Sequence, residues 1–391
     1  MTSTTATTDD FIARLERIVG PAGLVRDAAA QAHYHDDWLG KWHGRSCVIA
    51  RPADTGELAQ VVRLCHDTHT PLVPQGGHTG MSGGGTPDAS GAQLVLSTTR
   101  MNRIRAVDAV NNTLTVDAGV LLAQAQAAAL DADRFFPLAL GSEGSCTVGG
   151  NLATNAGGTA VLRYGNMRDL VLGLEVVLPD GRIWNGLRGL RKDNTGYDLR
   201  GLFIGSEGTL GVITGAVLKL FPRPRVRATA WVGAATLSDV VRLMATLRER
   251  CGERLTACEM MSADSLDLVL AHVTDTRSPL AARYPFTVLV ELSDVGDAQD
   301  SALATLLETA LGDAMATGLV ADAILATSEA QAKAFWKLRE GISQAQVRAG
   351  KAVKHDIALP ISQLATFVEA ADAAVAAASE VGRVINFGHI G

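Results

Sequence analysis

Apolar residues in the first half of the chain recur with the spacings of short strands and helices. A strand is expected at 48–50, then a helix whose apolar residues fall three or four positions apart, and then a second strand at 72–73. The same pattern predicts later elements, namely strands at 94–96, 113–116 and 173–178 and a helix at 121–130. This half is therefore expected to mix strands with short helices.

Beyond the sequence Phe221-Pro222-Arg223-Pro224 the pattern changes to long helices that alternate with strands. We expect helices at 238–250, 298–311 and 329–349, and strands at 286–292, 351–359 and 383–387. Such alternation predicts a sheet with helices on one face. The expected domains are an N-terminal helix and lead-in at 1–42, a domain at 43–222 and a second domain at 223–391.

Composition narrows the class of protein. With 391 residues, 47% hydrophobic and 19% charged, the chain can form two or three globular domains. A net charge of −6 without a basic stripe argues against nucleic acid as a partner. The acidic, polar start is not typical of a secretory signal. The sequence contains no uninterrupted apolar run of about 18 residues, so a membrane-spanning helix is not expected. Five cysteines without a CxxC pair indicate free thiols, and hence a cytoplasmic protein, with peripheral attachment to the inner membrane left open.

Residues 74–85, PQGGHTGMSGGG, form the most informative stretch. Six of the ten residues from Gly76 to Gly85 are glycine, and no charged residue occurs between Pro71 and Pro87. Glycine allows close backbone approach to a ligand, and successive N–H groups can converge on an anion such as a diphosphate. The alternative is a flexible surface linker. An anion-binding loop is the stronger interpretation, because two similar loops follow.

These further loops lie at 141–158 and 205–214. The first has one charged residue in eighteen and is rich in Gly, Ser, Thr, Asn and Ala. Such side chains can hydrogen-bond phosphate, ribitol and ring heteroatoms while leaving room for a flat ligand. None of the three loops has the GxGxxG spacing at the start of a helix, so a nicotinamide dinucleotide site is disfavoured.

Several segments in order resemble one flavoprotein family. They are PQGGHTGM (74–81), GSCTVGGNLATNAGG (144–158), RKDNTGYDL (191–199) and FIGSEGTLGVIT (203–214). With them the chain resembles the FAD-linked oxidases of the vanillyl-alcohol oxidase type, and more narrowly the D-2-hydroxyacid dehydrogenases. The resemblance implies an α+β fold, with a two-part FAD-binding domain and an α+β substrate domain built on an antiparallel sheet.

The resemblance also implies which residues hold FAD. They come from the three loops: Gly76, Gly77, His78, Thr79, Gly80 and Met81; Gly144, Ser145, Gly150, Asn151, Thr154, Asn155 and Gly158; and Glu207, Gly208, Gly211 and Val212. The first loop would hold the diphosphate, the second the diphosphate and isoalloxazine, and the third the adenine and flavin edges. In some relatives a histidine at the place of His78 carries the flavin covalently. We expect non-covalent FAD here, with covalent attachment as the alternative.

Oxidation of a 2-hydroxyacid also requires groups that hold the substrate carboxylate and move a proton. Arg339 and Ser343 lie four residues apart on one predicted helix, and Lys354 lies on a predicted strand, so the three could face one anion. The alternative is three solvated side chains. The resemblance implies that they hold the distal carboxylate of D-2-hydroxyglutarate, which would be oxidised to 2-oxoglutarate. D-lactate or glycolate is the alternative substrate.

The segment Asn386–Gly391 carries a second predicted feature. A lone histidine at a strand end is usually structural, but the resemblance implies that His389 is the first ligand of a divalent metal, with zinc expected. The other ligands and the base are expected beyond Gly391, so the alternative to an enzyme is a catalytically silent flavin-binding paralogue. The expected partners are a small 2-hydroxyacid and an electron acceptor (an electron-transfer flavoprotein, a quinone or a cytochrome), with a possible homodimer.

Overall fold

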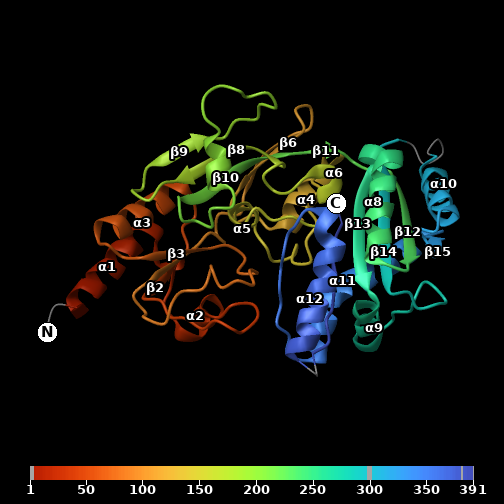
Figure 1. The fold of residues 1–391 in the computed structure, drawn as a ribbon. Coiled ribbons are helices and arrows are strands. Elements are labelled where there is room, and N and C mark those ends of the chain that lie inside the picture. Colours follow the sequence, from red (N-terminus) through yellow and green to blue (C-terminus); the bar gives the residue numbers. More distant parts are fainter. Residues whose placement is uncertain (1–3, 297–301, 380–381, 391) are drawn as a thin grey trace. The chain divides into compact units, whose positions relative to one another are not determined.

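The structure, a computed structural model, describes residues 4–296, 302–379 and 382–390 (Figure 1). It divides into two compact units. Unit 1 contains residues 1–158 and 165–223, and unit 2 contains residues 159–164 and 224–391. Each unit is described by itself.

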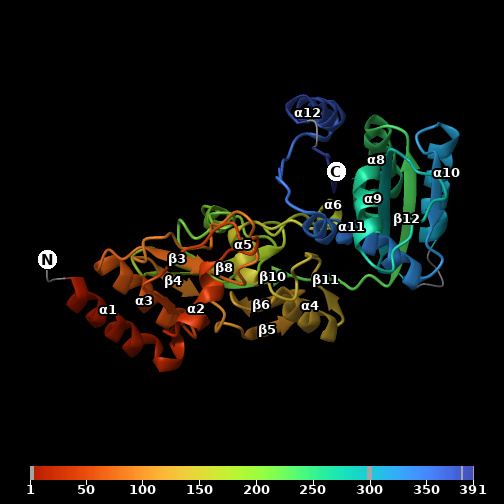
Figure 2. The ribbon, with the colours of Figure 1, turned by 90° about the horizontal axis from the view of Figure 1, so that it is seen from below.

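The first half of unit 1 is a small, largely parallel sheet. Its order is β1 (Leu24–Val25), β2 (Val48–Ala50), β4 (Leu94–Ser97) and β3 (Leu72–Gln75), with only β1 antiparallel to its neighbour. Parallel strands need a crossover, which α3 (Thr55–Asp67) supplies between β2 and β3. Figure 2 shows α3 and α1 (Thr4–Val19) next to this sheet, and α2 (Ala28–His35) follows β1 in the chain. Apolar residues of α1, α3, β2 and β4 form one core.

The second half of unit 1 is an antiparallel sheet. Its order is β5 (Ile104–Asp108), β6 (Thr113–Asp117), β10 (Val212–Lys219), β8 (Val171–Val177) and β9 (Ile183–Gly186). Every residue of β8 is buried. Val177 and Val212 belong to the same core as α3, so this helix packs against both sheets. The remaining elements of the unit are α4 (Leu122–Asp131), α5 (Val148–Ala153), α7 (Leu199–Phe203) and the short pair β7 (Arg134–Phe135) and β11 (Phe221–Pro222).

Unit 2 is built on an antiparallel sheet. The order is β15 (Asp322–Leu325), β12 (Val226–Ala234), β14 (Phe286–Asp294), β13 (Leu255–Ser262) and β16 (Phe387–His389). Ala230 and Val232 face a core with α8 (Leu237–Cys251) and α10 (Leu303–Ala316), whereas Trp231 faces a core with α9 (Ala263–His272) and α11 (Glu329–Ala349). The expectation of helices on one face is therefore wrong, because β12, β13 and β14 are buried on both faces.

Two further helices complete unit 2. They are α6 (Val161–Tyr164), which contacts β13, and α12 (Leu364–Ala378). The stretch Ile361–Ala378 has the length and apolar composition of a membrane-crossing helix, and 6% of it is buried. Glu369 and Asp372 lie within it, and Asn386 donates a hydrogen bond to Asp372 (2.9 Å). Length and composition alone assign it no membrane role.

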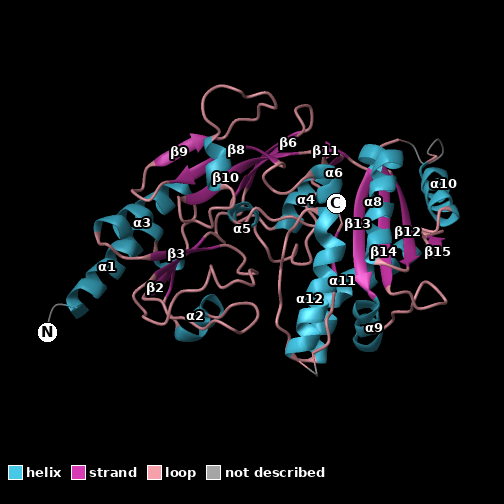
Figure 3. Cartoon of the chain, in the orientation of Figure 1, coloured by secondary structure: helices cyan, strands magenta, loops and turns pink. Residues whose placement is uncertain are grey.

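Of the six elements predicted for unit 2, three are confirmed and three differ. The segment 351–359 forms no strand (Figure 3), since Val353 and Ile357 project into solvent and no strand among the described residues pairs with it. The strand expected at 383–387 begins only at Phe387 and continues to His389. The helix expected at 298–311 begins at Leu303, and positions 298–301 lie outside the described residues.

Candidate functional site

The three glycine-rich loops meet around one cavity of about 180 Å³ in unit 1. Among the predicted residues that line it are Gly76, Gly77, His78, Thr79, Gly80, Gly150, Asn151, Thr154, Glu207, Gly208, Gly211 and Val212. Met81, Gly144, Ser145, Asn155 and Gly158 were predicted with them but are not part of this lining. The three loops, which are separated in the chain by 55 residues (86–140) and 46 residues (159–204), are thus brought to one place in the fold.

Glycine is required where the first two loops touch. A Cβ atom on Gly76 would lie 2.3 Å from Thr147 Oγ1, and one on Gly77 would lie 2.0 Å from the Ser145 carbonyl oxygen. The third loop approaches in the same way, because Gly208 has φ +79° and its Cβ would lie 2.7 Å from Pro74 Cγ. The cavity wall therefore consists largely of backbone, which can approach a ligand more closely than side chains would allow.

The cavity offers uncharged polar groups with one exception. Thr147 caps α5 by accepting a hydrogen bond from the Gly150 N–H (3.3 Å), and Thr154 donates to the Gly150 carbonyl (3.0 Å). Glu207 is the only acidic or basic side chain in the lining apart from His78. A wall of amide and hydroxyl groups suits a phosphate-bearing, flat ligand.

His78 already has a partner within the protein. Its backbone has φ +54°, and its Nε2 lies 2.7 Å from the Asp36 carbonyl oxygen. Because a carbonyl only accepts, Nε2 carries the proton in this arrangement. The ring is thus anchored by the backbone, which gives His78 a structural use. Non-covalent attachment of FAD stays a prediction.

A second cluster of predicted residues forms in unit 2 around Glu259. This glutamate lies on β13 with 1% of its side chain exposed. Its Oε2 accepts a hydrogen bond from Nε of Arg339 on α11 (2.9 Å) and forms an ion pair with Nη2 of the same guanidinium (2.7 Å). Its Oε1 pairs with Nδ1 of His389 on β16 (2.7 Å). The antiparallel register of β13 and β16 places Glu259 opposite His389.

Glu259 was not predicted from the sequence. It stands in the apolar strand sequence LTACEMMS, and a carboxylate is rarely buried unless it is paired. A carboxylate within an apolar strand was therefore the feature of the sequence that could have identified Glu259 as a buried, paired residue. The partners could not be read from the chain, because they lie 80 and 130 residues away.

The predicted convergence of Arg339, Ser343 and Lys354 on one anion stays a prediction, and the structure shows the setting of each residue. Arg339 has only 11% of its side chain exposed, pairs with Glu259 and lies over the Phe387 ring (5.1 Å to the centroid). Ser343 is exposed on α11, and Lys354 is partly buried in a segment without regular structure. Within the described part of the chain, no side-chain hydrogen bond or ion pair joins these two residues to Arg339.

The described residues do not support the predicted zinc site. They contain no group of three His, Cys, Asp or Glu side chains able to hold a metal. His389 has 51% of its side chain exposed, but its Nδ1 is bound to Glu259, whose two oxygens are both in use. One imidazole nitrogen, Nε2, is left for a ligand, which is too few for a structural zinc site.

Comparison with known protein families gives two matches. Residues 47–186 match the family described as FAD binding domain. Residues 223–391 match FAD linked oxidases, C-terminal domain. Among solved structures, the fold resembles p-cresol methylhydroxylase (TM-score 0.70, 15% identity, 88% of this chain and 72% of that one). It also resembles alkyldihydroxyacetonephosphate synthase (TM-score 0.67, 19% identity, 85% and 63%).

Relatives found by sequence are more similar to this chain than the solved structures are. D-2-hydroxyglutarate dehydrogenase, mitochondrial, of Bos taurus is 40% identical over 98% of this chain and 69% of its own length. D-2-hydroxyglutarate dehydrogenase of Xanthomonas citri pv. viticola is 36% identical over 98% and 79%. A Schizosaccharomyces pombe protein named "Putative D-lactate dehydrogenase", mitochondrial, is 37% identical over 90% and 64%. The chain thus spans about two thirds to four fifths of these relatives.

These names correct the predicted location. The Bos taurus and Schizosaccharomyces pombe relatives are mitochondrial, which contradicts the expectation of a cytoplasmic protein. The prediction used the five free cysteines, which the structure confirms. Free thiols indicate a reducing environment but do not identify the compartment.

Proposed function

The chain belongs to the FAD-linked oxidases of the D-2-hydroxyacid dehydrogenase group, and from that premise we propose that it oxidises a D-2-hydroxyacid to the 2-oxoacid. Bound FAD supplies the chemistry by accepting a hydride equivalent from the carbon that bears the hydroxyl. A separate electron acceptor then reoxidises the flavin. D-2-hydroxyglutarate is the proposed substrate.

The observation that carries the proposal is the glycine-walled cavity of unit 1. Its first two loops are so close that side chains at Gly76 and Gly77 would collide with Thr147 and the Ser145 carbonyl. Backbone amides, threonine hydroxyls and Asn151 are among the groups of the lining that can meet a ligand. They can bind a diphosphate and a flavin ring without a charged side chain, as FAD requires.

Unit 2 supports the substrate part of the proposal. Glu259 occupies the Nε and Nη2 side of the Arg339 guanidinium, which leaves Nη1 as a donor for a substrate carboxylate. Because the Glu259 carboxylate accepts a hydrogen bond from His389 Nδ1, Nε2 is the ring nitrogen left for a further contact. The proposed anion site consists of Arg339 with Ser343 and Lys354, which would hold the second carboxylate of D-2-hydroxyglutarate.

A smaller monocarboxylate is the second candidate, and one observation favours it. The charge of Arg339 is balanced by buried Glu259, so the anion site has less net positive charge than the sequence indicates. Lys354, the other cation of the proposed anion site, has no carboxylate partner among the described residues. One free cation suits a substrate with one carboxylate, such as D-lactate.

Anaerobic reduction of the flavin tests both candidates. We expect D-2-hydroxyglutarate to bleach the flavin absorbance of the purified FAD-loaded protein, and L-2-hydroxyglutarate to leave it unchanged. Equal or faster bleaching by D-lactate would favour the second candidate. A protein that holds FAD but is reduced by neither D-hydroxyacid would contradict the proposed activity.

A further inference from the structure

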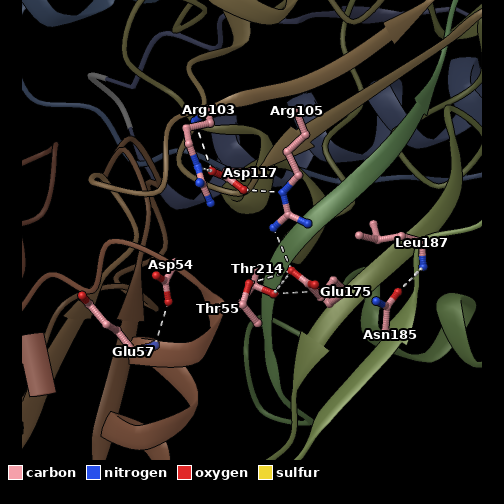
Figure 4. Close-up of polar contacts among 10 residues, drawn as sticks. All are labelled: Asp54, Thr55, Glu57, Arg103, Arg105, Asp117, Glu175, Asn185, Leu187 and Thr214. Carbon is pink, nitrogen blue, oxygen red and sulfur yellow. Dashed lines mark hydrogen bonds and ion pairs between the residues drawn. The ribbon is translucent and has the colours of Figure 1, made fainter.

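One carboxylate oxygen in unit 1 gathers donors from three separate elements (Figure 4). Glu175 lies in the middle of β8 and is 8% exposed. Its Oε1 accepts hydrogen bonds from the Thr55 hydroxyl at the start of α3 (2.6 Å), from Arg105 Nη2 on β5 (2.8 Å) and from the Thr214 hydroxyl on β10 (3.0 Å). The donors thus come from both halves of the unit.

The network continues to a second buried carboxylate. Arg105 also donates through Nε to Asp117, at the end of β6, and Asp117 accepts from the backbone N–H (3.2 Å) and Nε (3.0 Å) of Arg103. Two carboxylates therefore balance two guanidinium groups. Neither carboxylate lines the flavin cavity.

Two backbone features of β10 make room for this arrangement. The pairing of β10 with β8 shifts register between Ile213 and Gly215, so Thr214 is an extra residue whose hydroxyl turns toward Glu175. A Cβ atom on Gly215 would lie 2.9 Å from Arg105 Nη2, so a side chain there would displace the guanidinium. The bulge and the glycine are therefore needed for the contacts of Glu175.

Three elements of the network, β10, β6 and α3, lead to the cavity wall. On β10, the residues directly before Thr214 are Val212 and Ile213, which line the cavity. After Asp117, the Ala118 carbonyl accepts a hydrogen bond from the N–H of Gly149 (2.7 Å), another lining residue. Helix α3 leads through β3 into the first glycine loop.

We propose that Glu175 is a positioning residue for FAD, which holds α3, β5 and β10 in the register that brings the glycine loops together. It touches no part of the cavity itself and acts through these elements. Loss of its charge leaves Arg105 with one fewer carboxylate and weakens the hydrogen bond that joins the start of α3 to β8. The cavity then loosens, and FAD affinity falls.

The test compares Glu175→Gln with Glu291→Gln. Glu291 is a matched control in unit 2, since it is 6% exposed and accepts hydrogen bonds from Trp336 Nε1 (2.7 Å) and Thr229 (3.3 Å). FAD is titrated into the apo-protein and flavin fluorescence is recorded, together with the melting temperature of each apo-variant. We expect Glu175→Gln to raise the Kd for FAD about tenfold, a loss typical of one buried charged contact, and Glu291→Gln to leave it unchanged.

A purely structural role would give a different result. Glu175→Gln would then lower the melting temperature of the apo-protein but bind FAD as tightly as the wild type, and the proposal would be overturned. If Glu175→Gln does not fold, Thr214→Val removes one donor while keeping the shape of the side chain. An unchanged FAD Kd in Thr214→Val overturns the proposal, and a raised one supports it. No substrate enters the test, so its outcome is independent of the proposed oxidation.

Discussion

Single buried carboxylates carry much of the organisation of both units. Glu259 joins α11 to β16, and Glu175 joins α3 to β5 and β10. Removal of one member of such a pair leaves its partner buried and uncompensated, which costs more than the contact itself contributed. Substitutions at these positions are therefore expected to have effects well beyond those of surface ion pairs.

Replacement of Glu259 is the first case. We expect Glu259→Gln to lower the free energy of unfolding by about 3 kcal/mol, because Arg339 loses its charged partner in a buried setting. Urea denaturation followed by circular dichroism measures the change. The control is Lys333→Ala, which breaks the exposed pair of Lys333 with Glu329 and should have no measurable effect. Equal stability of Glu259→Gln and wild type would contradict the prediction.

Acid should affect the network around Glu175. Burial alone would raise the pKa of Glu175, but hydrogen bonds from Arg105 and Thr55 outweigh it and hold that pKa below its usual range. A carboxyl group with a lowered folded-state pKa contributes stability above its unfolded pKa of about 4.3 and loses that contribution as pH falls through the folded value. Apo wild type should therefore melt above apo Glu175→Gln at neutral pH.

The difference between these two melting temperatures should shrink below about pH 4. Thermal unfolding of both apo-proteins, recorded by circular dichroism across this range, measures it. A difference that grows as the solution is acidified would show that Glu175 is not held in its charged form by Arg105 and Thr55.

At the scale of elements, the loops around the flavin cavity depend on backbone contact. The first loop follows β3 directly, and its glycines lie against the turn before α5. Glycines of the first and second loops nevertheless differ in what surrounds them. That difference offers a sharp comparison of two substitutions with the same chemistry.

Gly77→Ala and Gly141→Ala form this pair. A Cβ atom on Gly77 would lie 2.0 Å from the Ser145 carbonyl oxygen, whereas one on Gly141, which is not part of the cavity lining, meets no atom within 4 Å. We expect Gly77→Ala to weaken FAD binding at least about tenfold by separating the two loops, and Gly141→Ala to bind FAD like wild type. The ratio of flavin to protein absorbance after gel filtration measures both. Similar flavin contents in the two variants would contradict this view of the cavity.

Whole elements were predictable where the signal is local. The amphipathic spacing of 329–349 gives α11 with its observed bounds, and the glycine loops indicate a flavin site without any knowledge of tertiary structure. The segment 351–359 has strand-like alternation but no neighbouring strand, so the local signal is misleading there. Strand formation depends on pairing, which a single segment does not encode.

At the scale of the whole molecule, the partners of buried charges could not be predicted. Glu175 receives its donors from residues 120, 70 and 39 positions away. For Arg339 the sequence suggested a free cation, and only the folded unit 2 reveals Glu259 beside it. The division into two units could not be predicted from the sequence for the same reason, because it depends on long-range contacts. Residues 159–164 belong to unit 2 although their neighbours in the chain belong to unit 1.

The two oxygens of Glu259 serve different partners, Arg339 and His389, from one charge. An anion that draws the guanidinium toward itself weakens its hold on Oε2 and leaves more negative charge for the imidazole. Under the proposed function, binding of an anion at Arg339 would therefore be linked to any contact made by His389 Nε2, and such a linkage is reciprocal. Glu259, with 1% of its side chain exposed, would then couple two positions without touching either ligand.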